Sequence, residues 1–585
     1  MKKARILLVN SINTNGNLTI SLGSIYLASI LKKNDLNVEI IDFNYLMNQG
    51  IIKKNKDPMM NYQSLSNYLI DENPDIIGFY TMCNSYHNVI QISKLVKQTD
   101  SNIKIMLGGP QASMCAEESM KFFGFFDLIS IGEGEMTITN IVKGLLGEYD
   151  LNIIPNIYFR KDNEVIKTKS REDLIDVDQL PFYDDTLMTF INDIEEMPIE
   201  VGRGCPFSCT YCSTKTFWKR RFRLKSTKRL IEEIKYFYYK YNKRNFNFIH
   251  DLFTANKKLV MEFCREVIKE DIEIKWCCSS RLDTLNEEVM QLMYEAGCKK
   301  IFLGIETGSQ RMQKLINKNL VVSDVMNQLK LLKKYKFDIT LSFIYGFPQE
   351  TIKDVEETLK LISNIYNEGI ISVQLHLFTP LVGTELYEQY KEELILDDYV
   401  TTISQGVNYE GSLDLIKNHP TIFPQFYNFD TYIRKEYRYL DKFITYIISK
   451  GNQILKSTYT TILSYYNGDL LKFYEEFIIA IPDFTIKLFD KEYNEIKFDY
   501  SNIIELIHEF IDKKKFDNKI QSIFEFERDI YYFLYVAEDK RTKQIRYNNN
   551  VLQIKKYPNK DRSNTEPVDV KFEFKDEKLV LKKVT

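Results

Sequence analysis

Residues 202–212 read Gly-Arg-Gly-Cys-Pro-Phe-Ser-Cys-Thr-Tyr-Cys, which places Cys205, Cys209 and Cys212 on one short, glycine-led loop. Thiolates are the usual ligands of iron–sulfur clusters and also bind zinc. No fourth cysteine is near, and His250 follows Cys212 by 38 positions, a poor zinc-finger spacing. Three thiolates can hold three irons of a 4Fe–4S cube and leave the fourth open for chemistry. The alternatives are a zinc site or three unrelated thiols.

The two hundred residues after this loop repeat a strand-then-helix pattern. Short apolar runs alternate with amphipathic helical stretches, which predicts at least half of a (β/α) barrel with its site at the carboxyl ends of the strands. Polar side chains fall at those ends, and they suit hydroxyl and amino-acid groups of a ligand. The alternative is a structural Arg–Glu ion pair at the barrel mouth. The expected strands are 246–249, 273–278, 300–303, 340–345 and 372–377, and the polar residues after them are Asp251, Arg281, Glu306 and Thr307.

The first 150 residues show the same alternation around five apolar runs. Continuous apolar strands separated by helices predict a parallel, doubly wound, Rossmann-like sheet that binds ligands beyond its carboxyl ends. No G-x-G-x-x-G follows the first run, so a dinucleotide site is not supported. The glycines after the later strands either approach a ligand or only make turns. The runs are 6–9, 38–41, 76–80, 103–107 and 128–131, and the candidate ligand contacts are Thr81, Ser85, Gly108, Gly109, Gly132, Glu133 and Gly134.

The chain is thus expected to be α/β with four parts: the sheet domain 1–150, a bridging linker 151–194 with a hairpin, the partial barrel 195–400, and an α-rich region 401–585. Alternation at 486–500 and 568–584 predicts two small strand pairs in the last part. We place substrate selection there as a hypothesis. His87 is interpreted as a surface or core residue rather than a metal ligand, and Cys277 and Cys278 as core residues.

Composition limits the class of protein. The 585 residues carry 78 basic and 81 acidic side chains, a net charge of −3, so no global excess points to nucleic acid. Nine cysteines are too sparse for a secreted disulfide framework and favour the cytoplasm. No apolar run approaches the roughly 18–20 residues of a membrane span.

The cysteine loop resembles the radical S-adenosylmethionine (SAM) superfamily, whose motif is C-x3-C-x-aromatic-C, with Tyr211 as the aromatic residue. The resemblance implies a 4Fe–4S cluster whose open iron chelates SAM and cleaves it reductively to a 5′-deoxyadenosyl radical. It also implies an electron donor such as flavodoxin or ferredoxin. The segments "SSRLDTL", "FLGIETGSQ", "FIYGFPQET" and "TPLVGTELY" look like those of superfamily members with an amino-terminal cobalamin-binding domain. On this resemblance we assign to SAM the residues Phe207, Tyr211, Asp251, Arg281, Glu306 and Thr307.

The same subfamily is similar to the first 150 residues, in "IMLGGPQAS" and "DLISIGEGE" among others. The likeness covers about residues 1–150 and 195–390. One departure is that residues 10–16 contain no histidine, so the D-x-H-x-x-G loop that ligates cobalt in many cobalamin proteins is absent. The resemblance implies cobalamin and a class B-like methyltransferase acting on an unactivated carbon, or on phosphorus, of a peptide or natural product. Rearrangement, cyclisation or ring contraction without methyl transfer is the alternative, and a cobalamin or redox sensor without turnover is a third.

Overall fold

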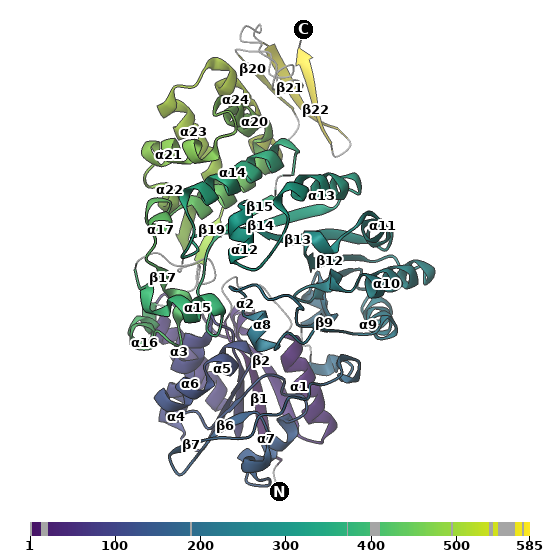
Figure 1. The fold of residues 1–585 in the computed structure, drawn as a ribbon, viewed down its shortest axis with the longest axis vertical. Helices are drawn as coiled ribbons and strands as arrows, with labels where there is room; N and C mark the ends of the chain where they lie inside the picture. The colour runs from purple at the N-terminus through teal and green to yellow at the C-terminus, as the bar shows by residue number, and fades with distance from the viewer. Residues whose placement is uncertain are drawn as a thin grey trace.

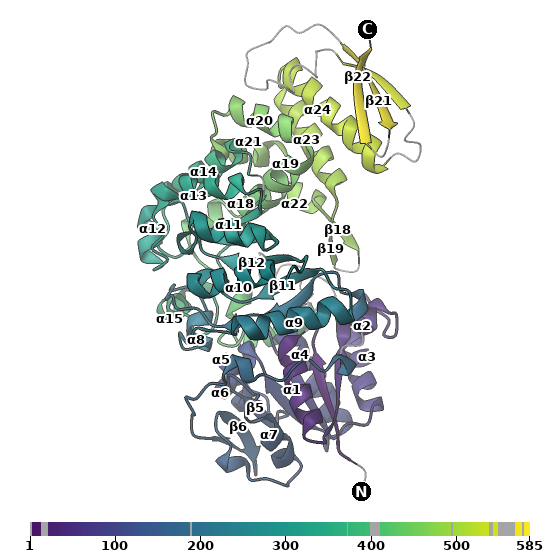
Figure 2. The same cartoon turned by 90° about the vertical axis from the view of Figure 1, so that its right-hand side faces the viewer.

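The computed structural model describes residues 3–12, 21–187, 190–370, 372–397, 410–492, 495–536, 542–547, 568–575 and 578–584. Figures 1 and 2 show an elongated molecule with the amino-terminal sheet at one end, a second sheet in the middle and a helical region at the other end. None of the helices among the described residues is long and apolar enough to cross a bilayer.

The first sheet has seven strands in the order β2-β1-β3-β4-β5-β6-β7. Its first five strands are parallel, as the apolar runs predict, and helices cover both faces. The predicted hairpin is present, but it extends this sheet, because β6 pairs antiparallel with β5. The strands are β1 (Arg5–Asn10), β2 (Asn37–Asp42), β3 (Ile76–Tyr80), β4 (Lys104–Gly108), β5 (Leu128–Ser130), β6 (Ile157–Lys161) and β7 (Glu164–Lys167). The helices are α1 (Leu22–Lys33), α2 (Phe43–Asn48), α3 (Pro58–Asp71), α4 (Tyr86–Thr99), α5 (Pro110–Met114), α6 (Ala116–Phe122) and α7 (Ile138–Leu145).

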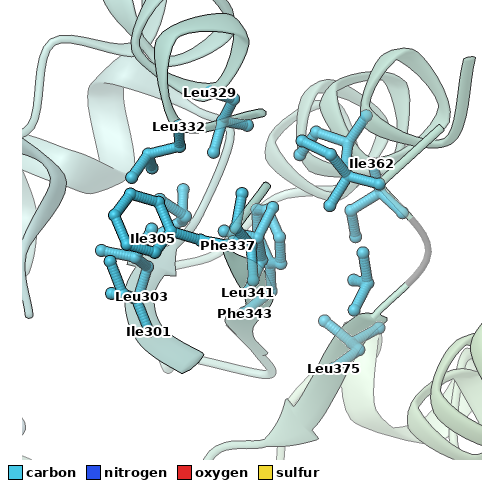
Figure 3. Close-up of a cluster of buried hydrophobic side chains, with 14 of the residues drawn as sticks. Ile301, Leu303, Ile305, Leu329, Leu332, Phe337, Leu341, Phe343, Ile362 and Leu375 are labelled. Carbon is cyan, nitrogen blue, oxygen red and sulfur yellow. The ribbon is translucent and has the colours of Figure 1, made fainter. Parts of the chain in front are cut away.

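The second sheet is a six-stranded parallel partial barrel in the order β15-β14-β13-β12-β11-β8. Alternate side chains pack outward beneath the covering helices: Leu303 and Leu341 belong to the same buried cluster as Leu329 of α13, and Figure 3 shows part of that cluster. The inward face is polar. The strands are β8 (Met197–Glu200), β11 (Asn245–Ile249), β12 (Lys275–Ser280), β13 (Cys298–Glu306), β14 (Asp338–Tyr345) and β15 (Ser372–Leu377). The helices are α8 (Thr214–Phe217), α9 (Thr227–Lys240), α10 (Lys257–Lys269), α11 (Glu287–Glu295), α12 (Gln310–Leu315), α13 (Val322–Lys334), α14 (Ile352–Asn367) and α15 (Glu385–Tyr390).

Most of the carboxyl-terminal helices continue the barrel's hydrophobic core. The second half of α24 (Asn518–Tyr531) instead contributes Phe526 to a small separate core with β20 (Thr542–Tyr547) and β21 (Val568–Lys575). The π-helix η11 (Phe443–Lys450) lies along the edge strand β15. The Thr445 hydroxyl accepts from Leu375 N–H at 2.9 Å and donates to its carbonyl at 3.0 Å, and the Ser449 hydroxyl accepts from Val373 N–H at 2.9 Å. These hydroxyls satisfy backbone groups that a further strand would otherwise pair.

Both predicted strand pairs are present in this region, and a third strand joins the second pair. The helices are α17 (Tyr432–Glu436), α18 (Leu440–Lys442), α19 (Gly451–Ile454), α20 (Lys456–Tyr465), α21 (Leu470–Ala480), α22 (Phe484–Lys487), α23 (Tyr500–Lys514) and α24 (Asn518–Tyr531). The strands are β18 (Phe489–Glu492), β19 (Glu495–Phe498), β20 (Thr542–Tyr547), β21 (Val568–Lys575) and β22 (Lys578–Val584).

Residues 411–427, which we call the strap, return from the barrel to the first domain. Ile416 and Phe423 are buried in that domain's core. The Gln111 side-chain amide donates to the Ile422 carbonyl at 2.7 Å. His87 lies fully buried beneath the strap, with Nδ1 3.2 Å from the Ser412 hydroxyl. The strap therefore holds the two sheet domains together through packing and hydrogen bonds.

Burial lowers the pKa of His87 from its ordinary 6.5 to about 3. The unfolded chain takes up a proton below about pH 6.5 while the folded chain does not, so stability is complete above that pH and is lost as pH falls. Between pH 6.5 and 5 we expect the wild type to lose about 1.6 kcal/mol more than His87→Gln. Urea unfolding at both pH values measures this difference. Equal losses in the two proteins would contradict it.

Candidate functional site

The cysteine loop lies between two short paired strands, β9 (Gly202–Arg203) and β10 (Arg223–Leu224). Gly204 has a φ of +82°, and a Cβ there would lie 2.2 Å from the Arg221 carbonyl oxygen, so only glycine fits this close approach. Cys209 is buried, whereas Cys205 and Cys212 are half-buried. The loop thus presents thiols of differing exposure at the carboxyl end of the barrel.

The cationic side chain of Arg281 and the aromatic ring of Phe207 lie beside these thiols. The Arg281 guanidinium lies 3.8 Å from Cys209 Sγ and 3.8 Å from the centroid of the Phe207 ring. It also donates to the Lys318 carbonyl at 2.7 Å and pairs with Asp283 at 2.8 Å. A fixed positive charge here stabilises thiolates or an anionic cluster that they hold.

The donor set fits a 4Fe–4S cube, in which each cysteine binds a different iron. Among the described residues, no three His, Cys, Asp or Glu side chains converge closely enough to share one metal ion. Burial raises the pKa of the Cys205 thiol to about 11, so iron must displace its proton.

The strand-end residues gather around the same loop, with one exception. The Glu306 carboxylate pairs with Lys318 at 2.8 Å and faces Tyr211. Asp251 accepts a hydrogen bond from the Thr214 hydroxyl at 3.0 Å. Thr307 is buried and its hydroxyl pairs with Thr358 of α14 at 3.1 Å, so it faces the covering helix.

A cavity opens beyond the carboxyl ends of β1, β3, β4 and β5. Gly108, Gly109, Gly132, Glu133 and Gly134 line it together with apolar side chains of the sheet. A Cβ on Gly109 would lie 2.8 Å from the Thr81 carbonyl oxygen, so this backbone approach also requires glycine. The cavity can accept a largely apolar ligand group close to the backbone.

Thr81 and Ser85 are not among the residues that line this cavity. The Thr81 hydroxyl is turned away, donating to the Gly108 carbonyl at 2.8 Å and accepting from Ala112 N–H at 2.9 Å. Ser85 instead lines a second cavity.

This second cavity is a cleft between the two sheets. Asn10, Asp42 and Ser85 line it from the first domain, and Asn247, Asp251 and Ser279 line it from the barrel. Asn10, Asp42, Asn247 and Ser279 were missed from the sequence. Asn10, Asp42 and Ser279 lie within one residue of the end of a predicted or observed strand, whereas Asn247 lies in the middle of β11. Ser279 and its neighbour Cys277 lie on the inward face of β12. Cys277 is half-buried there, 3.4 Å from the Asn247 side-chain oxygen, so its interpretation as a core residue is wrong, whereas Cys278 is in the core.

A buried ion network that no local sequence pattern predicts connects the two domains beside the cleft. Arg203, only 5% exposed, pairs with Glu133 at 2.8 Å, Glu135 at 2.6 Å and Glu200 at 3.0 Å. Arg223 pairs with Glu133 at 2.7 Å. Burial would raise the pKa of Glu133, but the two guanidinium groups outweigh it and lower that pKa. The Glu133 carboxylate therefore joins the domains rather than standing free in the cavity.

Two family models match the chain: the radical SAM superfamily at residues 199–362 and the B12 binding domain at residues 12–142. The chain is similar to an uncharacterized methyltransferase of Pyrococcus horikoshii, with 29% identity over 63% of this chain and 77% of the relative. It is also similar to the anaerobic magnesium-protoporphyrin IX monomethyl ester cyclase of Rubrivivax gelatinosus, with 25% identity over 56% of this chain. The match spans 60% of that cyclase, less than two thirds of its length.

The fold also matches a solved structure, the cobalamin-dependent S-adenosylmethionine radical enzyme OxsB with aqua-cobalamin bound. The TM-score is 0.63 at 16% identity, over 92% of this chain and 82% of that one. A radical SAM domain uses a 4Fe–4S cluster and SAM, and a B12 domain binds cobalamin, which accords with the thiol loop and the glycine-lined cavity. The chain therefore joins an amino-terminal B12-binding domain to a radical SAM domain.

Proposed function

We propose that this protein is a cobalamin-dependent radical SAM methyltransferase that alkylates an unactivated carbon, or phosphorus, of a peptide or natural product. The proposal rests on how close the glycine-lined cavity lies to the cysteine loop. That cavity and the cleft share Arg203 and Trp218 in their linings, and Arg203 lies two residues before Cys205. With both cofactors bound, the cluster supplies reductive SAM cleavage and cobalamin supplies the methyl group.

The chain's own residues have separable tasks in this proposal. Cys205, Cys209 and Cys212 hold the cluster. Arg281 and Glu306 orient the amino-acid end of SAM by charge and hydrogen bonding. The Arg281 guanidinium is held beside Cys209 and Phe207. Phe207, Tyr211 and Asp251 complete the proposed SAM shell, whereas Thr307 faces α14 and is left out of it. The proposed cobalamin contacts are Gly108, Gly109, Gly132 and Gly134 in the cavity and Ser85 in the cleft. The Thr81 hydroxyl and the Glu133 carboxylate, assigned to cobalamin from the sequence, are instead bonded within the protein.

The α-rich region reaches the barrel mouth and is the proposed substrate-recognition part. Tyr345, at the end of β14, donates to the Tyr437 carbonyl at 3.0 Å. On the next strand, the half-buried imidazole of His376 faces Asp441 and Lys442 of α18. Because these helices share the barrel's core, point substitutions at the mouth test this role more cleanly than deletion of residues 401–585.

Anaerobic reconstitution with iron, sulfide and hydroxocobalamin tests the proposal. We expect about four irons per chain and one cobalt. With a candidate substrate, the product should gain one CH2 unit and one 5′-deoxyadenosine should form per methylation. Four irons without cobalt would contradict the proposal.

Radical rearrangement or cyclisation is the second candidate, favoured by the similarity to the Rubrivivax gelatinosus cyclase. It predicts turnover without added carbon, so product mass separates the two candidates. A regulator would bind both cofactors without turnover.

We place the protein in the cytoplasm because its cysteines are sparse. We also propose an acidic electron donor, flavodoxin or ferredoxin, because the proposed chemistry requires a reductant.

A further inference from the structure

A tight turn at residues 218–221, which we call the basic turn, follows α8 directly after the cysteine loop. Arg221 N–H donates to the Trp218 carbonyl at 2.8 Å and closes the turn. Lys219 and Arg220 have φ values of +50° and +60°, in the left-handed region that residues with a Cβ seldom adopt. Both side chains are exposed. The turn thus presents two cationic side chains to the solvent.

The basic turn lies against the backbone that leads into the first cysteine. A Cβ on Gly204 would lie 2.2 Å from the Arg221 carbonyl oxygen and 3.2 Å from Trp218 Cβ. Gly204 directly precedes Cys205. A protein that docked on the turn would therefore sit beside the cluster loop, with one layer of backbone between them.

The charge on this turn is largely uncompensated. Arg221 is 4.0 Å from Glu172, a weak and exposed pair. Lys219 and Arg220 form no ion pair or hydrogen bond through their side chains with any residue that the structure describes. The whole chain is acidic, with a net charge of −3. A local positive patch on an acidic molecule attracts a negatively charged partner in one orientation.

We propose that the basic turn is the docking surface for an acidic one-electron donor protein that carries a flavin or an iron–sulfur cluster. The inference rests on the proposed radical SAM activity, which needs one electron for each SAM cleaved. In this step the donor loses one electron and the oxidised cluster gains it, with no bond broken and no proton moved. Docking at the turn keeps the transfer path short.

The test compares protein and chemical reduction of the same holoenzyme. The variant Lys219→Glu/Arg220→Glu reverses the exposed charges without breaking an ion pair that the structure describes. The rate of 5′-deoxyadenosine formation is measured with reduced flavodoxin, with an acidic ferredoxin and with dithionite. With subsaturating protein donor we expect a loss of at least about tenfold, because such charges act on association. With dithionite the rate should stay within about twofold.

Two further variants complete the design. Lys258→Glu/Lys360→Glu makes the same change in net charge at exposed lysines on α10 and α14 and should behave as the wild type with every donor. Lys219→Gln/Arg220→Gln should fall between the wild type and the reversed variant. In the wild type, raising the salt concentration should slow reduction by the protein donors, and the reversed variant should lose that dependence.

An equal rate in the wild type and the reversed variant with protein donors would overturn the docking site. So would a wild type that accepts dithionite but neither protein donor. If the iron-loaded wild type forms no 5′-deoxyadenosine with any donor, the proposed function itself fails.

Discussion

Cys209→Ala should reduce SAM cleavage to background, a loss of several orders of magnitude, since no side chain can replace the chemistry that the cluster supplies. Of the three cysteines of the loop, Cys209 is the one in contact with the Arg281 guanidinium, at 3.8 Å. Its removal takes away one ligand and leaves that cation facing a methyl group. The measurement is 5′-deoxyadenosine formed by anaerobically reconstituted protein with dithionite, together with iron per chain.

Cys277→Ala is the matched control, because Cys277 is a half-buried thiol of the same barrel outside the loop. It should keep the iron content of the wild type. Full cleavage activity in Cys209→Ala would refute the assignment of the loop to the cluster.

Arg203→Met should destabilise the protein by about 3–5 kcal/mol, the usual effect of removing one partner from a buried ion network. The substitution leaves Glu133, Glu135 and Glu200 with less compensation in a buried interface. Arg203 directly precedes Gly204 and Cys205, and its partners include residues of both domains. We therefore expect unfolding to begin at the interface between the domains. Urea unfolding measures it, and Trp218 is a local reporter, since its ring lies 5.7 Å from the Arg203 guanidinium.

Arg171→Met removes an exposed pair with Asp173 and should change stability by at most about 1 kcal/mol. Arg203→Lys keeps the positive charge but loses the planar guanidinium group that reaches three carboxylates. Its stability should therefore fall between those of the wild type and Arg203→Met. An unchanged urea midpoint in Arg203→Met would show that the carboxylates find other partners.

Most strands of the two sheets could be predicted from the sequence because they are short apolar or alternating runs between stretches of helical periodicity. All five runs of the first 150 residues became parallel strands. Residues at strand ends, such as Arg281 and Glu306, could be found because a parallel sheet brings those ends to one edge. For the sheets and for these strand-end residues, local sequence pattern and sheet topology together were enough to make the prediction.

Contacts between distant segments could not be found in this way. Arg203 and Glu133 are 70 residues apart and have no local pattern that pairs them. His87 and Ser412 are 325 residues apart, and the strap reads from sequence as an ordinary mixture of apolar and polar residues. Such pairs depend on how whole domains pack, which periodicity within one element does not encode.

The hydroxyl groups on η11 have a consequence for solubility. An open sheet edge is a template on which strands of other chains can add, and it promotes aggregation. Thr445 and Ser449 occupy backbone groups of β15 that such an intruder would need. The barrel can therefore stop at six strands without becoming a seed for self-association.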